Sequence, residues 1–300
     1  MSRKFQADLL LAACSVVWGA TFVIVKLALS DASVFVFLSL RFLLAALVLA
    51  LMERRNLRGV KAGLLGAGIL LGCLLFAGFA FQTIGLTLTT PSKSAFITGI
   101  FVVLVPLFLA VFGRKRVSRS VWIGVFTAVA GLYFLTVPPS GLANLNLGDV
   151  LTFGCAVIYA VHIIAIGHYA PRYSTGMLVF LQVTATGLLS LLAVPILSLA
   201  GWEAPRLVWT PGLLWAVLAT GLLATVGTIS VQVWVQRNTD SSHVALLLTL
   251  EPVFAGLTSY VFAGERLGPR ALAGAALILS GILIAELTGA PGEASPLHTE

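Results

Sequence analysis

The chain has 300 residues, of which 59% are hydrophobic and only 10% are charged. Soluble domains carry about 25% charged residues, so this composition excludes a soluble protein and indicates a chain embedded in a lipid bilayer. The net charge of +7 does not indicate nucleic-acid binding, because the basic residues lie at the ends of apolar segments and form no cluster on a soluble face.

Ten apolar segments are long enough to cross a membrane, since about 20 helical residues span roughly 30 Å of hydrocarbon. They are residues 7–29, 33–52, 62–86, 93–112, 119–137, 149–168, 174–199, 211–236, 241–262 and 269–288. The connections between them are short and leave no room for a soluble domain. We therefore predict an all-α integral membrane protein with ten transmembrane helices.

The second half of the sequence repeats the first, at an offset of 141 that rises to 150. The matched pairs are Asp8 with Asp149, Leu10 with Leu151, Cys14 with Cys155, Val16 with Val157, Trp18 with Tyr159, Arg41 with Gln182, Gln82 with Gln232, Ser92 with Ser242 and Ala95 with Ala245. Apolar residues often match by chance, but Asp, Cys, Ser and Gln also align here, which indicates a duplicated unit.

Each unit holds five spans, an odd number, so the second unit enters the membrane from the opposite side. Two inverted five-helix repeats of this kind form many secondary transporters. The predicted organisation is a first repeat in residues 1–137, an external linker in 138–148, a second repeat in 149–288 and a disordered cytoplasmic tail in 289–300.

The basic residues predict the orientation. With the N-terminus inside, twelve lie on the cytoplasmic side: Arg3, Lys4, Arg54, Arg55, Arg58, Lys61, Arg114, Lys115, Arg116, Arg119, Arg172 and Arg237. Only Lys93, Arg206, Arg266 and Arg270 lie outside. Cytoplasmic loops of membrane proteins carry the excess of Lys and Arg, so we expect both termini in the cytoplasm. The three cysteines lack metal-ligand spacing, and we predict neither a metal nor a cofactor.

Ionisable residues inside the spans are candidates for a site, because a charge is costly in hydrocarbon. Lys26 lies about one turn from the outer end of its helix, where it either extends to the headgroups or faces the interior. Arg41 lies about 12 Å deep at 1.5 Å per residue, so it faces protein or a wet cavity. Contact with helix-end carbonyls and contact with a substrate are both open for Arg41.

Glu251 lies near the middle of the ninth span and is followed by Pro252. Proline removes an amide donor and breaks the helical ladder, and broken helices at this depth occur where transporters place their sites. Pro106 predicts a similar break in the fourth span. For Glu251 two interpretations stay open: a structural carboxylate bonded to neighbouring groups, and a carboxylate used in transport.

Aromatic and polar residues share helix faces in the first and sixth spans. Trp18, Thr21 and Phe22 have i, i+3, i+4 spacing, and Tyr159 and His162 occupy the equivalent face of the second repeat. Such faces form either the wall of an amphipathic pocket or an ordinary helix-packing surface, and His162 is alternatively a satisfied core histidine. Gln82 and Gln232 are similarly placed.

Several motifs resemble the EamA branch of the drug/metabolite transporter superfamily over about residues 8–288. They are Trp18-Gly-Ala-Thr-Phe22 with Lys26, Arg41-Phe42, Gln82-Thr-Ile-Gly-Leu86, Ser92-Lys-Ser-Ala-Phe-Ile-Thr-Gly99, Val105-Pro106, Leu250-Glu251-Pro252-Val253-Phe254 and Gly264-Glu265-Arg266-Leu267. The chain departs from the family pattern at Gly113-Arg114-Lys115, where Gly-Glu-Arg is common, at the Glu-Pro pair missing from the first repeat, and at Tyr159, where Trp is usual.

The resemblance implies a carrier of the bacterial cytoplasmic (inner) membrane that moves small metabolites, often exporting amino acids or drugs. It also implies a central cavity lined mainly by helices 1, 3, 4, 6, 8 and 9. We expect amino acids or related amphipathic compounds as substrates, export by alternating access, and a monomer or weak homodimer. A multidrug or sugar-type permease of the same fold and a channel or receptor remain alternatives. An enzyme is not expected, because no nucleophile, base or metal cluster is recognisable at depth.

Overall fold

The computed structural model describes residues 3–56, 60–112, 119–137, 145–239, 241–248 and 250–287. Their helices are α1 (Arg3–Ala28), α2 (Val34–Glu53), α3 (Ala62–Leu88), α4 (Pro91–Thr98), α5 (Phe101–Phe112), α6 (Arg119–Thr136), α7 (Leu147–Tyr169), α8 (Thr175–Leu199), α9 (Pro211–Leu218), the π-helix η3 (Ala219–Gly227), α10 (Thr228–Gln236), α11 (Ser241–Leu247), α12 (Leu250–Phe262) and α13 (Pro269–Leu287). Within the described residues the only extended pairing is one isolated bridge between Ala32 and Leu207. The predicted all-α class is confirmed.

Seven helical runs among the described residues are long and apolar enough to cross a membrane, judged by length and composition. They are Gln6–Ala28, Val34–Glu53, Ala62–Leu88, Pro91–Phe112, Leu147–Tyr169, Thr175–Leu199 and Pro211–Gln236. Two shorter apolar helical stretches, Trp122–Thr136 and Pro269–Ile284, lie in α6 and α13. The chain is therefore a multi-pass membrane protein.

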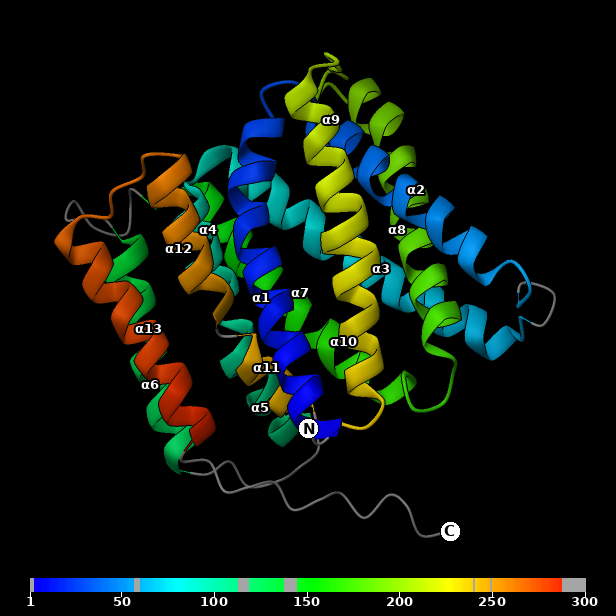
Figure 1. Ribbon diagram of the computed structural model, residues 1–300. Helices are drawn as coiled ribbons and strands as arrows, with labels where there is room; N and C mark the ends of the chain where they lie inside the picture. Colours follow the sequence, from blue (N-terminus) through cyan, green and yellow to red (C-terminus); the bar gives the residue numbers. More distant parts are fainter. Residues whose placement is uncertain are drawn as a thin grey trace, which may run out of the picture.

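Helices from the two halves of the sequence lie side by side (Figure 1). α6 packs along α13, α2 packs along α8, and α3 packs against both α7 and α8. α1 contacts α12 on one side and the continuous run of α9, η3 and α10 on the other. The closest packing partners are thus mostly distant in sequence.

Glycines bring the backbones of α6 and α13 into direct contact. A Cβ added to Gly131 would lie 2.6 Å from the Gly274 carbonyl oxygen, and one added to Gly274 would lie 2.7 Å from the Gly131 oxygen. Two turns further along α13, a Cβ added to Gly281 would lie 2.5 Å from the carbonyl oxygen of Gly124. Membrane helices associate through such small residues, because lipid supplies no hydrophobic force between helices and close packing must hold them together.

Two helical runs are interrupted, and the first interruption lies against the helix that follows the second. α4 ends at Thr98 and α5 begins at Phe101, while α11 ends at Leu247 and α12 begins at Leu250. A Cβ on Gly99 would lie 2.7 Å from Cγ of Pro252, so the first interruption packs against the start of α12. Only glycine fits at this contact.

The interruption of the fourth span differs in position from the one expected at Pro106. Pro106 lies inside α5, whereas around Gly99 and Ile100 the amides of Ile100, Val102 and Val103 donate to carbonyls three residues earlier. A single proline removes one ladder bond, which a helix packed on its neighbours tolerates. Several consecutive three-residue bonds tighten the turn and separate two helices. Pro252 likewise lies within the first turn of α12, just after its interruption, where no amide donor is needed.

Polar side chains join helix ends where α1 and α3 finish and α4 and α7 begin. Nζ of Lys26 donates to the carbonyl oxygens of Leu86 at 2.6 Å, Thr87 at 3.1 Å and Thr89 at 3.0 Å, so it satisfies the C-terminus of α3. The buried carboxylate of Asp149 accepts from Oγ1 of Thr89 at 2.5 Å and pairs with Nζ of Lys93 at 2.6 Å. Lys26 is thus bonded to the C-terminus of α3.

The α6–α13 contact predicts a selective effect of adding one methyl group. Gly274→Ala should lower the free energy of unfolding by about 1–3 kcal/mol, because the new Cβ overpacks a backbone–backbone contact. Gly66→Ala in α3 is the matched control, since its Cβ would have no neighbour within 4 Å and alanine favours a helix. Thermal unfolding of the purified variants in detergent compares them, and equal melting temperatures would contradict the packing described here.

Candidate functional site

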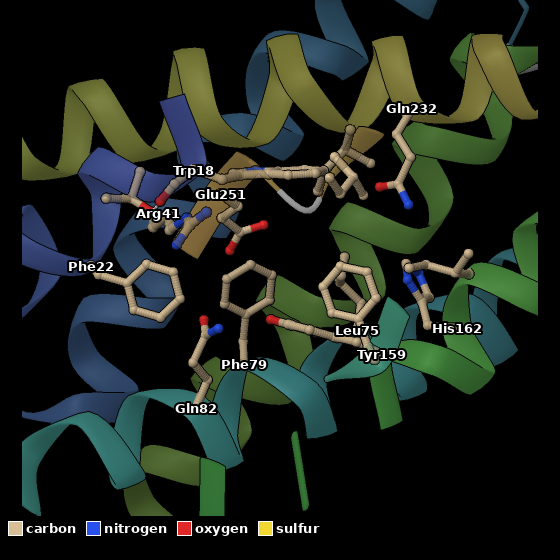
Figure 2. Close-up of a pocket in the computed structure, with 15 residues that line it drawn as sticks. Trp18, Phe22, Arg41, Leu75, Phe79, Gln82, Tyr159, His162, Gln232 and Glu251 are labelled. Atoms are coloured by element: carbon tan, nitrogen blue, oxygen red, sulfur yellow. Dashed lines mark hydrogen bonds between the residues drawn. The ribbon is translucent and has the colours of Figure 1, made fainter. Parts of the chain in front are cut away.

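A cavity inside the bundle collects every cavity residue expected from the sequence (Figure 2). The expected residues that line it are Trp18, Thr21, Phe22, Arg41, Gln82, Tyr159, His162, Gln232 and Glu251. It also contains Leu75, Phe79, Phe101, Ile163, Ile229 and Leu248. The cavity has a volume of about 70 Å³, below the range of about 300–1,000 Å³ typical of sites for drug-sized ligands.

Most of the additional lining residues, though not Phe101, follow from helix geometry. Leu75 and Phe79 lie seven and three residues before Gln82, on the same face of α3, and Ile229 lies three residues before Gln232 on α10. Extending each helix face by i±3 and i±4 from the polar candidates would have identified them. The second span also contributes, through Arg41 on α2, although the family resemblance had not placed that helix among the main cavity helices.

Aromatic rings form much of the wall. The rings of Phe79 and Tyr159 meet edge to face, with centroids 5.7 Å apart, and Phe79 meets Phe42 in the same way at 4.9 Å. Gly78 on α3 lies directly against the ring of Tyr159, so α3 and α7 approach closely at this level. Edge-to-face contacts of this kind are favourable beyond the area they bury and fix the rings in place.

Arg41 is held behind this aromatic wall. Its side chain is 2% exposed, its Nε donates to Oγ1 of Thr225 at 3.0 Å, and its Cζ lies 4.5 Å from the ring centroid of Phe79. The ring of Phe42 lies on it at 5.1 Å. Cation–π contacts strengthen when the cation is desolvated, so the two rings and one hydroxyl stabilise the buried charge. Among the described residues Nη2 has no hydrogen-bond partner.

The π-helix η3 supplies the partners of Arg41 and Trp18. Nε1 of Trp18 donates to the carbonyl oxygen of Ala224 at 2.9 Å, and Oγ1 of Thr225 accepts the hydrogen bond from Nε of Arg41. A π-helix has wide turns with bonds from residue i to i+5, and such segments often mark functional sites. η3 therefore anchors α1 and α2 at the depth of the cavity.

His162, Gln82 and Gln232 differ in how many of their hydrogen-bonding groups have a partner. Nε2 of His162 lies 3.0 Å from Oε1 of Gln182, which supports the interpretation of a bonded core histidine, although the ring also lines the cavity. Nε2 of Gln82 donates weakly to Oγ1 of Thr98 at 3.4 Å. In Figure 2 the amide of Gln82 points toward the centre of the cavity, and that of Gln232 points toward His162.

Glu251 projects into the cavity from the first turn of α12. Its side chain is 8% exposed, and its backbone amide donates to Leu248 at 3.1 Å across the interruption. α1 packs on α12 at this point, because a Cβ on Gly19 would lie 2.7 Å from the Glu251 carbonyl oxygen. Figure 2 shows the carboxylate directed toward the ring of Phe79. Among the described residues none forms a hydrogen bond or an ion pair with this carboxylate.

The described residues contain no group of three or more His, Cys, Asp or Glu side chains arranged to hold a metal ion. A multi-pass helical bundle with an amphipathic cavity among interrupted helices has the architecture of a membrane transporter. The profile of the EamA-like transporter family matches residues 5–137 and again residues 146–287. The chain belongs to this family and is a transporter, not an enzyme.

Curated relatives agree with this assignment. The chain is 34% identical to an uncharacterized transporter of Archaeoglobus fulgidus, over 95% of this chain and 87% of that protein. It is 24% identical to the uncharacterized transporter YoaV of Bacillus subtilis, over 91% of this chain and 94% of the relative. It is 26% identical to the threonine/homoserine exporter RhtA of Escherichia coli K12, over 61% of this chain and 59% of that exporter.

A crystal structure of a protein that is 22% identical in sequence has the same fold. The two chains superpose with a TM-score of 0.68, over 95% of this chain and 98% of the other.

The Arg41–Thr225 contact predicts a loss of stability when the hydroxyl is removed. Thr225→Val should lower the free energy of unfolding by about 1–3 kcal/mol, because Nε of a buried guanidinium loses its hydrogen bond. Thr127→Val is the matched control, since that hydroxyl bonds only to the Ile123 carbonyl of its own helix and should change stability by less than about 0.5 kcal/mol. Equal melting temperatures of the two variants would show that Thr225 does not stabilise Arg41.

Proposed function

We propose that the chain is a secondary transporter that exports amino acids or related amphipathic metabolites by alternating access. The observation that carries the proposal is the interior cavity, with its aromatic wall, its two amides and one free carboxylate. An amphipathic solute matches such a lining. Phosphorylated sugars do not, because they usually demand clustered Arg or Lys, whereas Arg41 is the only Arg or Lys in this lining. The name of the relative RhtA, a threonine/homoserine exporter, supports amino acids as substrates.

The proposed architecture is ten transmembrane helices in two inverted five-helix repeats, residues 1–137 and 149–288, joined by an external linker in 138–148. Three observations support it. The family profile matches the chain twice. The pairs α2–α8 and α6–α13 each join helices at the same place in the two halves. The interruptions after Thr98 and after Leu247 also fall at nearly equivalent positions, since the offset of 150 places residue 98 on residue 248. Carriers of this kind alternate by moving one bundle against another around a site near the midplane.

The proposal predicts the kinetics of a carrier. Protein reconstituted in liposomes should show saturable uptake of an amino acid. Uptake should be faster when the same unlabelled amino acid is inside, because the binding site of an alternating-access carrier then turns back to the outside with substrate bound. A panel of amino acids, sugars, nucleosides and cationic drugs, with and without a pH gradient, identifies the substrate class. Flux that rises linearly with concentration and shows no counterflow would indicate a channel, and preferred transport of a phosphosugar or nucleotide sugar would overturn the proposed substrates.

The proposed location is the bacterial cytoplasmic membrane with both termini inside. In a variant whose natural cysteines are replaced by alanine, Ser140→Cys in the linker should react with impermeant maleimide added to intact cells. Arg55→Cys should react only after the cells are opened, because the excess of basic residues stays in the cytoplasm. The reverse labelling pattern would refute this orientation and the inverted arrangement with it.

A further inference from the structure

The two charged side chains of the cavity lining, Arg41 and Glu251, are presented to a ligand in different ways. The guanidinium of Arg41 is covered by the rings of Phe79 and Phe42 and tied to Thr225. Its Nη2 is buried as well. Only 2% of the Arg41 side chain is exposed, so a carboxylate in the cavity reaches little of its charge.

Glu251 is presented directly. Its side chain is more than nine-tenths buried, its carboxylate is aimed into the cavity, and the described part of the chain offers it neither a hydrogen-bond donor nor a cation. A buried carboxylate without a partner is costly, and the cost falls when a cation pairs with it. The group that this carboxylate lacks is thus a cation.

The surroundings of Glu251 also favour a cation. The lining places the rings of Trp18, Phe22, Phe79 and Tyr159 around the same space. Ring faces attract ammonium groups by about 0.5–2 kcal/mol, most strongly away from water. A carboxylate together with aromatic faces is suited to an organic ammonium group attached to an apolar body.

The remaining polar groups are neutral. The amides of Gln82 and Gln232 line the cavity, and they can donate hydrogen bonds to a carboxylate, an ester or an amide alike. The carboxylate of an amino acid would thus meet mainly neutral donors here, whereas its ammonium group would meet the carboxylate of Glu251.

We propose that Glu251 binds the ammonium group of the substrate, and that the cavity accepts organic ammonium ions whether or not they carry a carboxylate. The inference rests on the proposed function and deepens it. Aromatic amines and the amides and esters of amino acids should then bind with affinities similar to those of the parent amino acids. N-acylated amino acids, which have no ammonium group, should bind much more weakly. Glu251 sets specificity for the charged pole of the substrate, and the aromatic wall receives the apolar part.

The experiment measures binding to the purified full-length protein by fluorescence of its tryptophans, with four probes. We expect phenethylamine and L-phenylalanine amide to bind within threefold of L-phenylalanine or more tightly, and N-acetyl-L-phenylalanine to bind at least 30-fold more weakly. Glu251→Gln should weaken the two amines at least tenfold. Glu203→Gln is the matched control, because Glu203 accepts the backbone amide of Val34 at 2.8 Å, away from the cavity, and should leave all four affinities unchanged.

The comparison of probes on the unmodified protein needs no variant, so it decides the matter even if Glu251→Gln does not fold. Equal binding of N-acetyl-L-phenylalanine and L-phenylalanine amide would overturn the proposal, and so would unchanged amine binding in folded Glu251→Gln. Amino-acid counterflow together with either result would leave the proposed function intact. Amine binding without any amino-acid transport would refute the proposed function and support the ammonium site.

Discussion

Every backbone amide and carbonyl at membrane depth must find its partner inside the protein, because hydrocarbon offers none. Irregular backbone is therefore confined to the places where other parts of the bundle satisfy it. Here those places are the interruptions around Gly99 and before Leu250 and the π-helix η3. Two lining residues, Trp18 and Arg41, bond directly to η3, and Leu248 and Glu251 flank one interruption. The need to satisfy the backbone and the location of the cavity are two aspects of one arrangement.

The same constraint explains why the two charges of the lining behave differently. Arg41 reaches a hydroxyl and two ring faces, so its charge is stabilised by the fold itself and contributes to holding α2 against η3. Glu251 lies beside an interruption, where the backbone turns toward the cavity and the side chain projects away from its own helix. One charge is thus part of the framework and the other is left for a ligand. Sequence alone gave both residues the same two interpretations, and their neighbours separate them.

Hydropathy located the helices well, because burial in lipid is the dominant requirement of the chain: the segment expected at 33–52 is Val34–Glu53, and that expected at 174–199 is Thr175–Leu199. The cavity residues were also predictable, since polar groups at depth have few other places to lie. Predictions from the local sequence were wrong where contacts with distant segments decide the structure. Pro106 was expected to break its helix, yet the break lies around Gly99, which packs against Pro252. The π-helix and the role of Lys26 at the end of α3 depend on partners distant in sequence, and no local pattern indicates them.

The π-helix also limits how the length of this segment can change. Each residue of a helix turns the chain by about 100°, so the loss of one residue within Ala219–Gly227 would allow an ordinary α-helix but would rotate everything after it. Ile229 and Gln232 would then leave the cavity wall, and the Ala224 carbonyl would return to its own helix and away from Trp18. Substitutions in η3 change side chains one at a time, whereas a deletion shifts the register of the whole wall. The number of residues in this stretch is therefore more tightly constrained than their identity.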